Sequence, residues 1–247
     1  MTGAAIPLFE INPALDRAGL AAAFARDGCV QVGDVLTERT AREIRRILAE
    51  ETPWGLSWQA GTALPPEHVR PQAMAARTPA ERAAIGEALA RAMAGSDYGF
   101  AYGAYPMVDA YQQRWDPGHP LDLVLEHLND APFLDLARAI TGLPALVKAD
   151  AQATLYGPGQ FLARHSDSHV GEGWRVAYVL HLTAAEWRPE WGGHLVFFDE
   201  AGDVTGGFRP RFNSLNLFTV PRWHAVTYVP PFAPVGRYAI TGWLRDR

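Results

Sequence analysis

The stretch from Leu146 to Leu244 decides the fold, because it contains six short apolar runs. In chain order they are LVKADAQATLY (146–156), WRVAYVLHLT (174–183), GGHLVFFDE (192–200), SLNLFTV (214–220), HAVTYV (224–229) and GRYAITGWL (236–244). Gly, Pro, Asn or Asp residues separate the runs. Regularly spaced short strands of this kind are typical of an antiparallel sandwich or barrel. We therefore expect a β-rich core in this half of the chain.

The sequence before this stretch predicts mainly helices. Apolar residues recur at helical spacing in four segments, which are 15–26, 37–51, 78–93 and 121–141, the last interrupted near Pro132. Thr37 is expected to cap the second helix. The third opens with TPAE, in which Thr78 and Glu81 have the spacing of a capping box. The order of helices first and strands later therefore predicts that helices brace the β core.

Two further segments complete the prediction for the first half. Cys29–Val32 is β-like and predicts an early strand, whereas residues 53–77 are rich in Pro and Ala and predict a long loop that could act as a lid. The expected fold class is α+β, with a double-stranded β-helix (jelly-roll or cupin-like) core. We expect a single domain over residues 1–247, in which residues 1–144 form a mainly helical supporting half with early strands. Residues 145–247 then form the catalytic core.

Composition narrows the classes of partner. The net charge of −5 gives no electrostatic reason to expect nucleic acid or an anionic membrane. Cys29 is the only cysteine, which excludes an intramolecular disulfide and suits a reducing cytoplasm. The opening segment MTGAAIPLFEINPALDRAGL lacks the pattern of a signal peptide, and no apolar run approaches the roughly 20 residues that span a bilayer. We therefore expect a cytoplasmic protein, whose oligomeric state the sequence leaves open.

Three side chains in the strand-rich half have the chemistry of a metal site. His165 and Asp167 lie two positions apart in the triplet HSD, and residues at i and i+2 of an extended segment point to the same face. His224 follows the run SLNLFTV after a turn at Pro221. Two imidazoles and one carboxylate form the facial triad that leaves open positions on iron(II). The pattern therefore predicts a catalytic metal site held by His165, Asp167 and His224.

Arg237 adds a second element to this pattern. Its guanidinium is a permanently charged fork that suits the carboxylate of a dicarboxylate ligand. An H-x-D triplet alone arises often by chance, and a lone His is more often structural. The order of an H-x-D triplet, a distal His and an Arg, all on strand-like runs, is much harder to obtain by chance.

Four strings within Ala151–Trp243 resemble the catalytic domain of the prolyl 4-hydroxylase group of iron(II)/2-oxoglutarate-dependent oxygenases. They are LYGPGQFLARHSD (155–167), RVAYVLHLTAAEWRPEWGGHLVFFD (175–199), RFNSLNLFTVPRWHAV (211–226) and RYAITGW (237–243). Within that group the strings are most similar to the branch that hydroxylates a prolyl residue of a ribosomal protein. The N-terminal helices resemble the group only loosely.

The resemblance implies roles for individual residues near the cosubstrate. The three triad residues match the iron ligands, and Arg237 matches the basic residue that pairs with the distal carboxylate of 2-oxoglutarate. Tyr156 matches a tyrosine that lines the same pocket. Thr241, on the same strand face as Arg237, offers a hydroxyl nearby. His181 stands where relatives often carry a tyrosine that bonds the cosubstrate tail, and an imidazole can also donate to a carboxylate.

The resemblance also implies the reaction and the substrate contacts. The cofactors would be Fe(II), 2-oxoglutarate as cosubstrate and O2, with ascorbate as reductant, and the products would include succinate and CO2. Related halogenases have a small residue at the position of Asp167, so the carboxylate favours hydroxylation. Arg164 and Trp223, which flank triad residues, are the expected substrate contacts. His169 is expected to be a loop residue near the mouth of the site.

Three functions stay open at this point. The first is hydroxylation of a prolyl residue in a protein or peptide. The second keeps the metal chemistry but takes a small-molecule substrate, such as a free amino acid or a lipid-like acid. The third is a non-catalytic, cupin-like binding protein, which the complete ligand set together with Arg237 disfavours.

Overall fold

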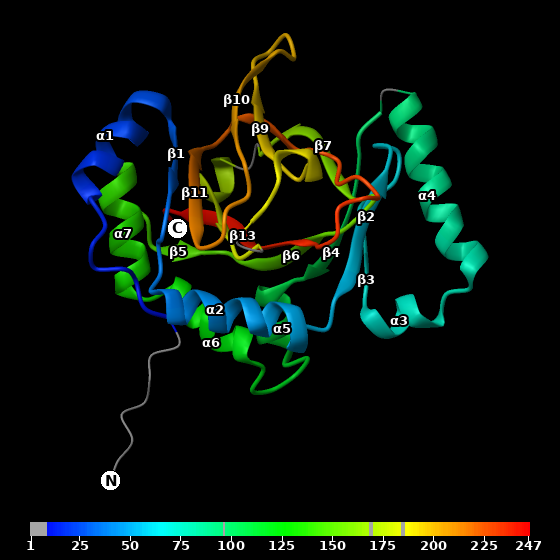
Figure 1. The fold of residues 1–247 in the computed structure, drawn as a ribbon, viewed down its shortest axis with the longest axis horizontal. Helices are drawn as coiled ribbons and strands as arrows, with labels where there is room; N and C mark the ends of the chain where they lie inside the picture. The colour runs from blue at the N-terminus through cyan, green and yellow to red at the C-terminus, as the bar shows by residue number, and fades with distance from the viewer. Residues whose placement is uncertain (1–8, 96, 168–169, 184–185) are drawn as a thin grey trace.

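The strands form one antiparallel sheet that curls into a nearly closed barrel (Figure 1). The computed structural model describes residues 9–95, 97–167, 170–183 and 186–247. Within these ranges the strands are β1 (Cys29–Val32), β2 (Gly55–Ala60), β3 (Glu67–Val69), β4 (Gly99–Tyr105), β5 (Lys148–Ala149), β6 (Gln152–Tyr156), β7 (Phe161–Ser166), β8 (Trp174–His181), β9 (Leu195–Phe198), β10 (Val204–Phe208), β11 (Ser214–Thr219), β12 (Trp223–Val226) and β13 (Arg237–Arg245). Their order in the sheet is β1-β11-β8-β13-β6-β4-β7-β12-β9-β10. The β2–β3 hairpin extends from β4, and β5 pairs with β13.

Helices cover the outside of this barrel. They are α1 (Arg17–Asp27), α2 (Glu38–Arg46), which continues into a π-helical turn (Ile47–Glu51), α3 (Pro71–Ala76), α4 (Pro79–Ala94), α5 (Met107–Gln113), α6 (Pro120–Leu128) and α7 (Ala131–Thr141), with short 3₁₀ turns at Val170–Glu172 and Pro189–Trp191. In Figure 1, α1, α2, α5, α6 and α7 gather along one side and the base, and α4 lies at the opposite edge. The predicted α+β class, with a jelly-roll core braced by N-terminal helices, is confirmed.

Alternation along the strands separates the helix-covered face from the interior of the barrel. In β8, Tyr178 and Leu180 belong to the large core cluster that also holds residues of α2, α6 and α7. Ala177 and Val179, which alternate with them along the strand, belong to a different cluster on the interior side. Successive side chains of a strand point to opposite faces, so His181 shares the interior face with Val179. The helices pack on the outer apolar face of the sheet, which holds them in place. The inner face of the sheet is therefore free to form the site.

The four predicted helices are present, with one difference at a cap. Thr78 accepts a hydrogen bond from the Glu81 backbone N–H while the Glu81 carboxylate accepts from the Thr78 backbone, so the capping box is confirmed. Thr37 stands at the N-cap of α2 but makes no side-chain bond to the helix backbone. Its hydroxyl instead contacts Thr40 and Glu10. Thr37 is therefore the N-cap residue of α2, as predicted, although its side chain does not bond to the first turn.

The prediction of a long loop over residues 53–77 is also wrong. This segment forms the β2–β3 hairpin and helix α3, and all six residues of β2 pair with β4. Its prolines sit where strands and helices tolerate them, since Pro65 and Pro66 precede β3 and Pro71 opens α3. High proline content therefore marked the ends of these elements rather than a loop.

Strand β4, GFAYGAY, lies in the middle of the sheet between β6 and β7, although it comes from the mainly helical half of the sequence. All seven of its residues are buried, so it lacks the alternation of apolar and polar residues that reveals a half-exposed strand. The supporting half of the chain thus contributes a central strand to the barrel.

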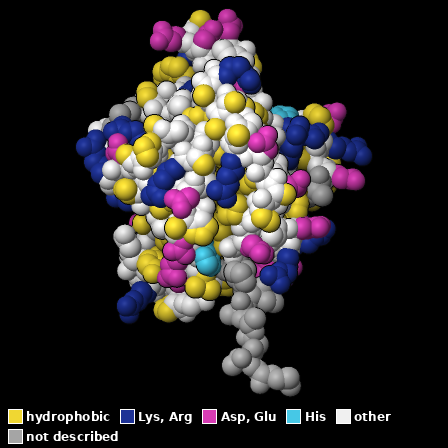
Figure 2. Space-filling model, turned by 90° about the vertical axis from the view of Figure 1, so that its left-hand side faces the viewer, with side chains coloured by type: hydrophobic (Ala, Val, Ile, Leu, Met, Phe, Trp, Pro, Cys, Tyr) yellow, Lys and Arg dark blue, Asp and Glu magenta, His cyan; other side chains and the backbone are white. Residues whose placement is uncertain are grey.

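No helix of the described ranges is both long and apolar enough to cross a membrane. Figure 2 shows the face that carries α1 and α7, where basic and acidic side chains are interspersed. Acidic side chains gather at the protruding tip in that view, where Asp199, Glu200 and Asp203 form the exposed turn between β9 and β10. This face therefore offers no broad basic area of the kind that binds nucleic acid.

Asn213 joins the segment after β1 to the start of β11. Its Oδ1 accepts from the Leu36 backbone N–H at 3.0 Å, and its Nδ2 donates to the Leu36 carbonyl at 2.8 Å. The side chain is 3% exposed, and the backbone is left-handed with φ of 55°. Asn tolerates this backbone conformation better than most residues.

We predict that Asn213→Ala lowers the free energy of unfolding by about 2–4 kcal/mol, because two buried hydrogen bonds are lost and Ala disfavours positive φ. Asn213→Gly is the matched control, since it loses the same bonds but accepts the backbone conformation, and it should cost about 1–2 kcal/mol less. Urea denaturation of both variants measures the difference. Equal losses would show that the backbone conformation contributes nothing.

Candidate metal centre and cosubstrate pocket

Pairing of β7 with β12 brings the two candidate histidine ligands together. His165 lies directly opposite His224 in the register, and their ring centroids are 4.1 Å apart. The register shifts just beyond this pair, because Val226 pairs with Leu162 rather than with Ala163. This bulge lets Leu162 and His165, which are three residues apart, both line the same cavity.

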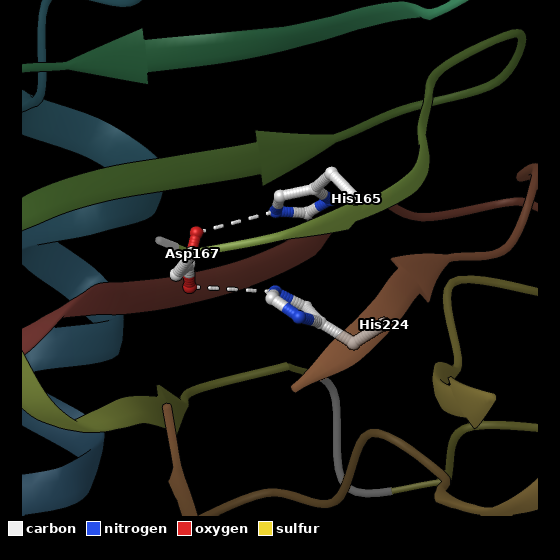
Figure 3. Close-up of side chains that lie close together, drawn as sticks. All are labelled: His165, Asp167 and His224. Carbon is white, nitrogen blue, oxygen red and sulfur yellow. Dashed lines mark ion pairs between the residues drawn. The ribbon is translucent and has the colours of Figure 1, made fainter. Parts of the chain in front are cut away.

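The donor atoms of the three residues converge on one point (Figure 3). Nε2 of His165 lies 3.6 Å from Oδ1 of Asp167, and Nε2 of His224 lies 3.7 Å from Oδ2. The three ligand atoms all lie within 4.8 Å of one another. Two imidazole nitrogens and a carboxylate oxygen at this spacing fit a divalent iron ion with open coordination positions.

Backbone carbonyls fix the tautomer of both rings. Nδ1 of His165 faces the Ala163 carbonyl at 2.9 Å, and Nδ1 of His224 faces the Arg222 carbonyl at 2.8 Å. A carbonyl can only accept, so each Nδ1 carries the proton and each Nε2 keeps its lone pair. Burial, followed by the charge of His165, lowers the pKa of His224 to about 4. His224 is therefore neutral at physiological pH, as a metal ligand must be.

Trp243 orients the carboxylate ligand. Its indole Nε1, on strand β13, donates to Oδ2 of Asp167 at 2.9 Å. The Trp243 ring stacks on Trp174 with centroids 3.9 Å apart and an angle of 14° between the planes. Asp167 is itself buried, at 8% exposure. A bond from outside the ligand set thus fixes the position of the carboxylate before any metal binds.

The triad opens onto a cavity of about 460 Å³ inside the barrel. Its lining includes the aromatic side chains Tyr98, Tyr102, Tyr156, Trp174 and Trp243. The Tyr102 and Tyr156 rings stack at 5.0 Å. Gln59 and Pro66, from the β2–β3 hairpin, also border the cavity. The volume lies within the range of small-molecule sites and exceeds what a metal ion alone requires.

Arg237 is the cation of this cavity and is only 1% exposed. Its guanidinium carbon lies 4.9 Å from the centre of the Tyr156 ring, and among the described residues no carboxylate is paired with it. Its Nε is buried without a hydrogen-bond partner there. Burial lowers the pKa of Arg237 to about 10, so it is still charged at neutral pH. An uncompensated buried cation of this kind calls for an anionic ligand.

The structure brings together six of the predicted site residues. The triad, Arg237, Tyr156 and Thr241 all line the one cavity. His181 is fully buried on the same interior face, beside Ala239 and two positions along from Arg237 in the register. His169 lies outside the described residues.

Arg164 and Trp223, the expected substrate contacts, do not line this cavity. The Arg164 guanidinium stacks on the Trp223 ring at 4.1 Å and donates to the carbonyls of Asp199 and Glu200. Alternation along β7 explains the position of Arg164, because successive side chains of a strand point to opposite faces and Arg164 is next to His165. Contact of either residue with substrate stays a prediction, and it applies to the rim rather than to the cavity.

Sequence reasoning missed two contributions to the site. Trp243 had a usable signal, because it lies six residues after Arg237 on one strand and therefore on the same face. Tyr98 and Tyr102 had no such signal in the sequence. Tyr98 precedes β4 and Tyr102 lies in it, and β4 was not predicted as a strand. Their place beside the metal ligands depends on the order of strands in the sheet.

Comparison with known proteins supports the class that the site indicates. Residues 151–245 match the model of the 2OG-Fe(II) oxygenase superfamily. The match confirms the predicted resemblance to 2-oxoglutarate oxygenases over these residues and supports a dioxygenase enzyme, and the superfamily implies Fe(II), 2-oxoglutarate and O2. A comparison with curated proteins finds no match.

Solved structures share the fold over most of the chain. A prolyl-4-hydroxylase from Pseudomonas putida is 21% identical with a TM-score of 0.55, covering 94% of this chain and 99% of its own. A Trichoplax adhaerens prolyl hydroxylase in complex with a hypoxia inducible factor peptide fragment is 14% identical, with a TM-score of 0.51 and coverage of 93% and 89%. The alpha-ketoglutarate-dependent epimerase SnoN from nogalamycin biosynthesis is 16% identical, with a TM-score of 0.53 and coverage of 94% and 83%. The fold therefore occurs with hydroxylation and with epimerisation, and it does not by itself select the reaction.

We predict that Trp243→Phe weakens Fe(II) affinity by about tenfold, because Asp167 loses the donor that orients it. Anaerobic calorimetric titration with Fe(II) measures the change. Trp187→Phe is the matched control, since it removes another indole donor, which is buried and bonded to the Gly192 carbonyl away from the triad. Equal loss of affinity in both variants would refute a specific role for Trp243.

Proposed function

We propose that the protein is an Fe(II)- and 2-oxoglutarate-dependent dioxygenase that hydroxylates a prolyl residue in a protein or peptide, with release of succinate and CO2. One observation carries the proposal. A His-Asp-His triad with preset Nε2 lone pairs and an unpaired buried arginine line the same cavity. A non-catalytic protein that only binds a metal needs the triad alone. A site for a dicarboxylate that chelates the metal needs both the triad and the buried arginine.

Each residue has a defined task in this proposal. His165, Asp167 and His224 would hold the iron, and Trp243 keeps the Asp167 carboxylate in place. With iron and 2-oxoglutarate bound, the site would supply the oxidative chemistry that converts a C–H bond to an alcohol. Arg237 would pair with the distal carboxylate of the cosubstrate, deep in the cavity where water is excluded and the ionic bond is strong.

Tyr156, Thr241 and His181 would complete the cosubstrate pocket. Tyr156 is buried against Arg237, and its pKa is raised well above its ordinary value by burial, so it is a neutral hydroxyl donor. Thr241 adds a hydroxyl on the same strand face, four residues from Arg237.

A prolyl residue fits the chemistry of the cavity. The aromatic side chains of Tyr98, Trp174 and Trp243 near the triad suit the apolar pyrrolidine ring. Exposed Trp223, with Arg164 stacked on it, suits the backbone of a peptide outside the cavity. Similarity to a prolyl hydroxylase in complex with a peptide fragment supports the same substrate class.

The enzyme's cellular location and the organisation of its chain are part of the same proposal. We infer a cytoplasmic enzyme with ascorbate as reductant, which the single cysteine and the iron chemistry support. Residues 145–247 would form the catalytic core and residues 1–144 its support, within one domain of 247 residues. Burial of β4 between β6 and β7 supports one domain, because the two parts share a sheet.

We predict that the protein releases succinate from 2-oxoglutarate in the presence of Fe(II) and ascorbate, and that His165→Ala and Asp167→Ala abolish this release, because the facial triad is broken. Succinate is measured by mass spectrometry. Metal-loaded protein without turnover, even with peptide libraries present, would favour the non-catalytic binding protein.

We predict that Arg237→Ala weakens 2-oxoglutarate binding by about 2–5 kcal/mol, because the distal carboxylate would be buried without a charge partner. Fe(II) affinity should change little. Arg245→Ala is the matched control on the same strand, since it removes an arginine that pairs with Asp150 at 3.2 Å. Calorimetry with each ligand separates the two effects, and parallel loss of both affinities would exclude the assigned role.

The substrate is tested with a library of proline-containing peptides. The proposal expects a mass gain of one oxygen atom, assigned to proline by fragmentation. Oxidation of a free amino acid or lipid-like acid, with every peptide unchanged, would replace the prolyl substrate by a small molecule and leave the metal chemistry intact.

A further inference from the structure

Three polar side chains from neighbouring strands cross the interior face of the barrel towards Arg237. Gln31 of β1 pairs in register with Asn216 of β11, and His181 of β8 pairs with Ser214 on the same face. Gln31 Nε2 lies 2.9 Å from Asn216 Oδ1, and Asn216 Nδ2 lies 3.0 Å from His181 Nε2. Asn216 and His181 are fully buried. Burying polar side chains costs free energy, so the presence of this buried polar row requires an explanation.

A backbone carbonyl fixes the direction of every hydrogen bond in the row. Gln31 Nε2 also lies 3.0 Å from the Arg209 carbonyl, which can only accept, so the NH2 group of Gln31 must face it. The second hydrogen of the same NH2 points to Asn216, which therefore presents its oxygen to Gln31. Asn216 in turn presents its NH2 to His181, whose Nε2 must accept. The imidazole proton of His181 is thereby placed on Nδ1.

This Nδ1–H has no acceptor among the described residues, although the atom is buried. It lies on the same sheet face as Arg237, because His181 pairs with Ala239, two residues along β13. Among the described residues, Arg237 Nε is a second buried donor on this face without a hydrogen-bond partner. Two unsatisfied donors on one face, one of them charged, have the pattern of a site for an anion that accepts from both.

We propose that Gln31 and Asn216 are positioning residues that hold His181 as the neutral Nδ1–H tautomer, so that its imidazole donates to the anionic end of the ligand that pairs with Arg237. The inference rests on the proposed function, in which that ligand is the distal carboxylate of 2-oxoglutarate. It assigns a role in cosubstrate binding to Gln31 on the N-terminal strand β1, far from the catalytic motifs in sequence.

Neutrality of His181 is essential to this arrangement. Burial, and then the charge of Arg237, hold the pKa of His181 well below its ordinary value. The pocket therefore gains a donor without a second positive charge beside Arg237. The tautomer of His181 then decides whether its contact with a carboxylate is attractive or repulsive. An Nδ1 lone pair would repel the carboxylate, whereas an Nδ1–H attracts it.

Gln31→Glu tests the proposal, because a carboxylate can only accept. Asn216 should then turn its NH2 towards the new carboxylate and present its oxygen to His181, which must move its proton to Nε2. We expect the tautomer to switch and the affinity for 2-oxoglutarate to fall by about tenfold or more. Fe(II) affinity should be unchanged, because Gln31 lies outside the triad. Asn216→Asp should give the same switch by a separate route.

The tautomer is read from long-range ¹H–¹⁵N correlation spectra of the metal-free protein, with His181 assigned through His181→Gln. Gln160→Glu is the matched control, since Gln160 accepts from the Gly157 N–H through its oxygen and has no contact with the row. Ligand affinity is measured by calorimetry on the wild-type and variant proteins loaded with Fe(II) under anaerobic conditions.

Each outcome decides the proposal. A switched tautomer together with weaker 2-oxoglutarate binding supports it. An Nε2–H or doubly protonated His181 in the wild type overturns it, and so does a switched tautomer with unchanged ligand affinity. Wild-type protein that binds iron but not 2-oxoglutarate overturns the proposed function and the ligand contact with it, whereas the spectrum of the ligand-free protein still decides separately whether Gln31 and Asn216 set the tautomer.

Discussion

Antiparallel pairing of β7 with β12 holds His165 against His224, and the rest of the site is arranged around that pair. The pairing fixes the separation of the two rings, and carbonyls two residues before each histidine fix their tautomers. Asp167 then needs only to follow His165 by two positions to close the triad. Because both strands lie inside a curled sheet, the ligands face the interior, where the burial of Asp167 and His224 strengthens their attraction to a cation.

The interior carries two opposite charges that the protein does not pair with each other. Asp167 lies at the metal end, and Arg237 lies on β13 with its guanidinium buried. Burial of either charge alone is costly, so each is balanced only when its ligand is present. A cation at the triad and an anion at Arg237 would offset both costs, and ligands that bind only the folded state stabilise it. The stability of this barrel is in that sense coupled to its cosubstrate and metal.

Different strands supply different parts of the same site. β7 and β12 supply the metal ligands, β13 supplies Arg237 and the tryptophan that orients Asp167, and β1, β11 and β8 supply the row that ends at His181. Helices on the outer face hold these strands in place without contributing to the cavity. The same architecture occurs in prolyl hydroxylases and in an epimerase, so the reaction depends on the side chains of the inner face rather than on the fold.

Local patterns in the sequence were sufficient for the longer helices, for most strands after residue 145 and for the choice of His165, Asp167 and His224 as candidate metal ligands. Strand-like runs, a capping box at Thr78 and the i, i+2 spacing of His165 and Asp167 depend on neighbouring residues alone, and the structure contains each of them. Only the tertiary structure decided which strands lie side by side. The insertion of β4 between β6 and β7, the hairpin within residues 53–77 and the tautomer of His181 all depend on contacts between segments far apart in the chain. Such contacts follow from register and from the burial of whole faces, which a single strand does not encode.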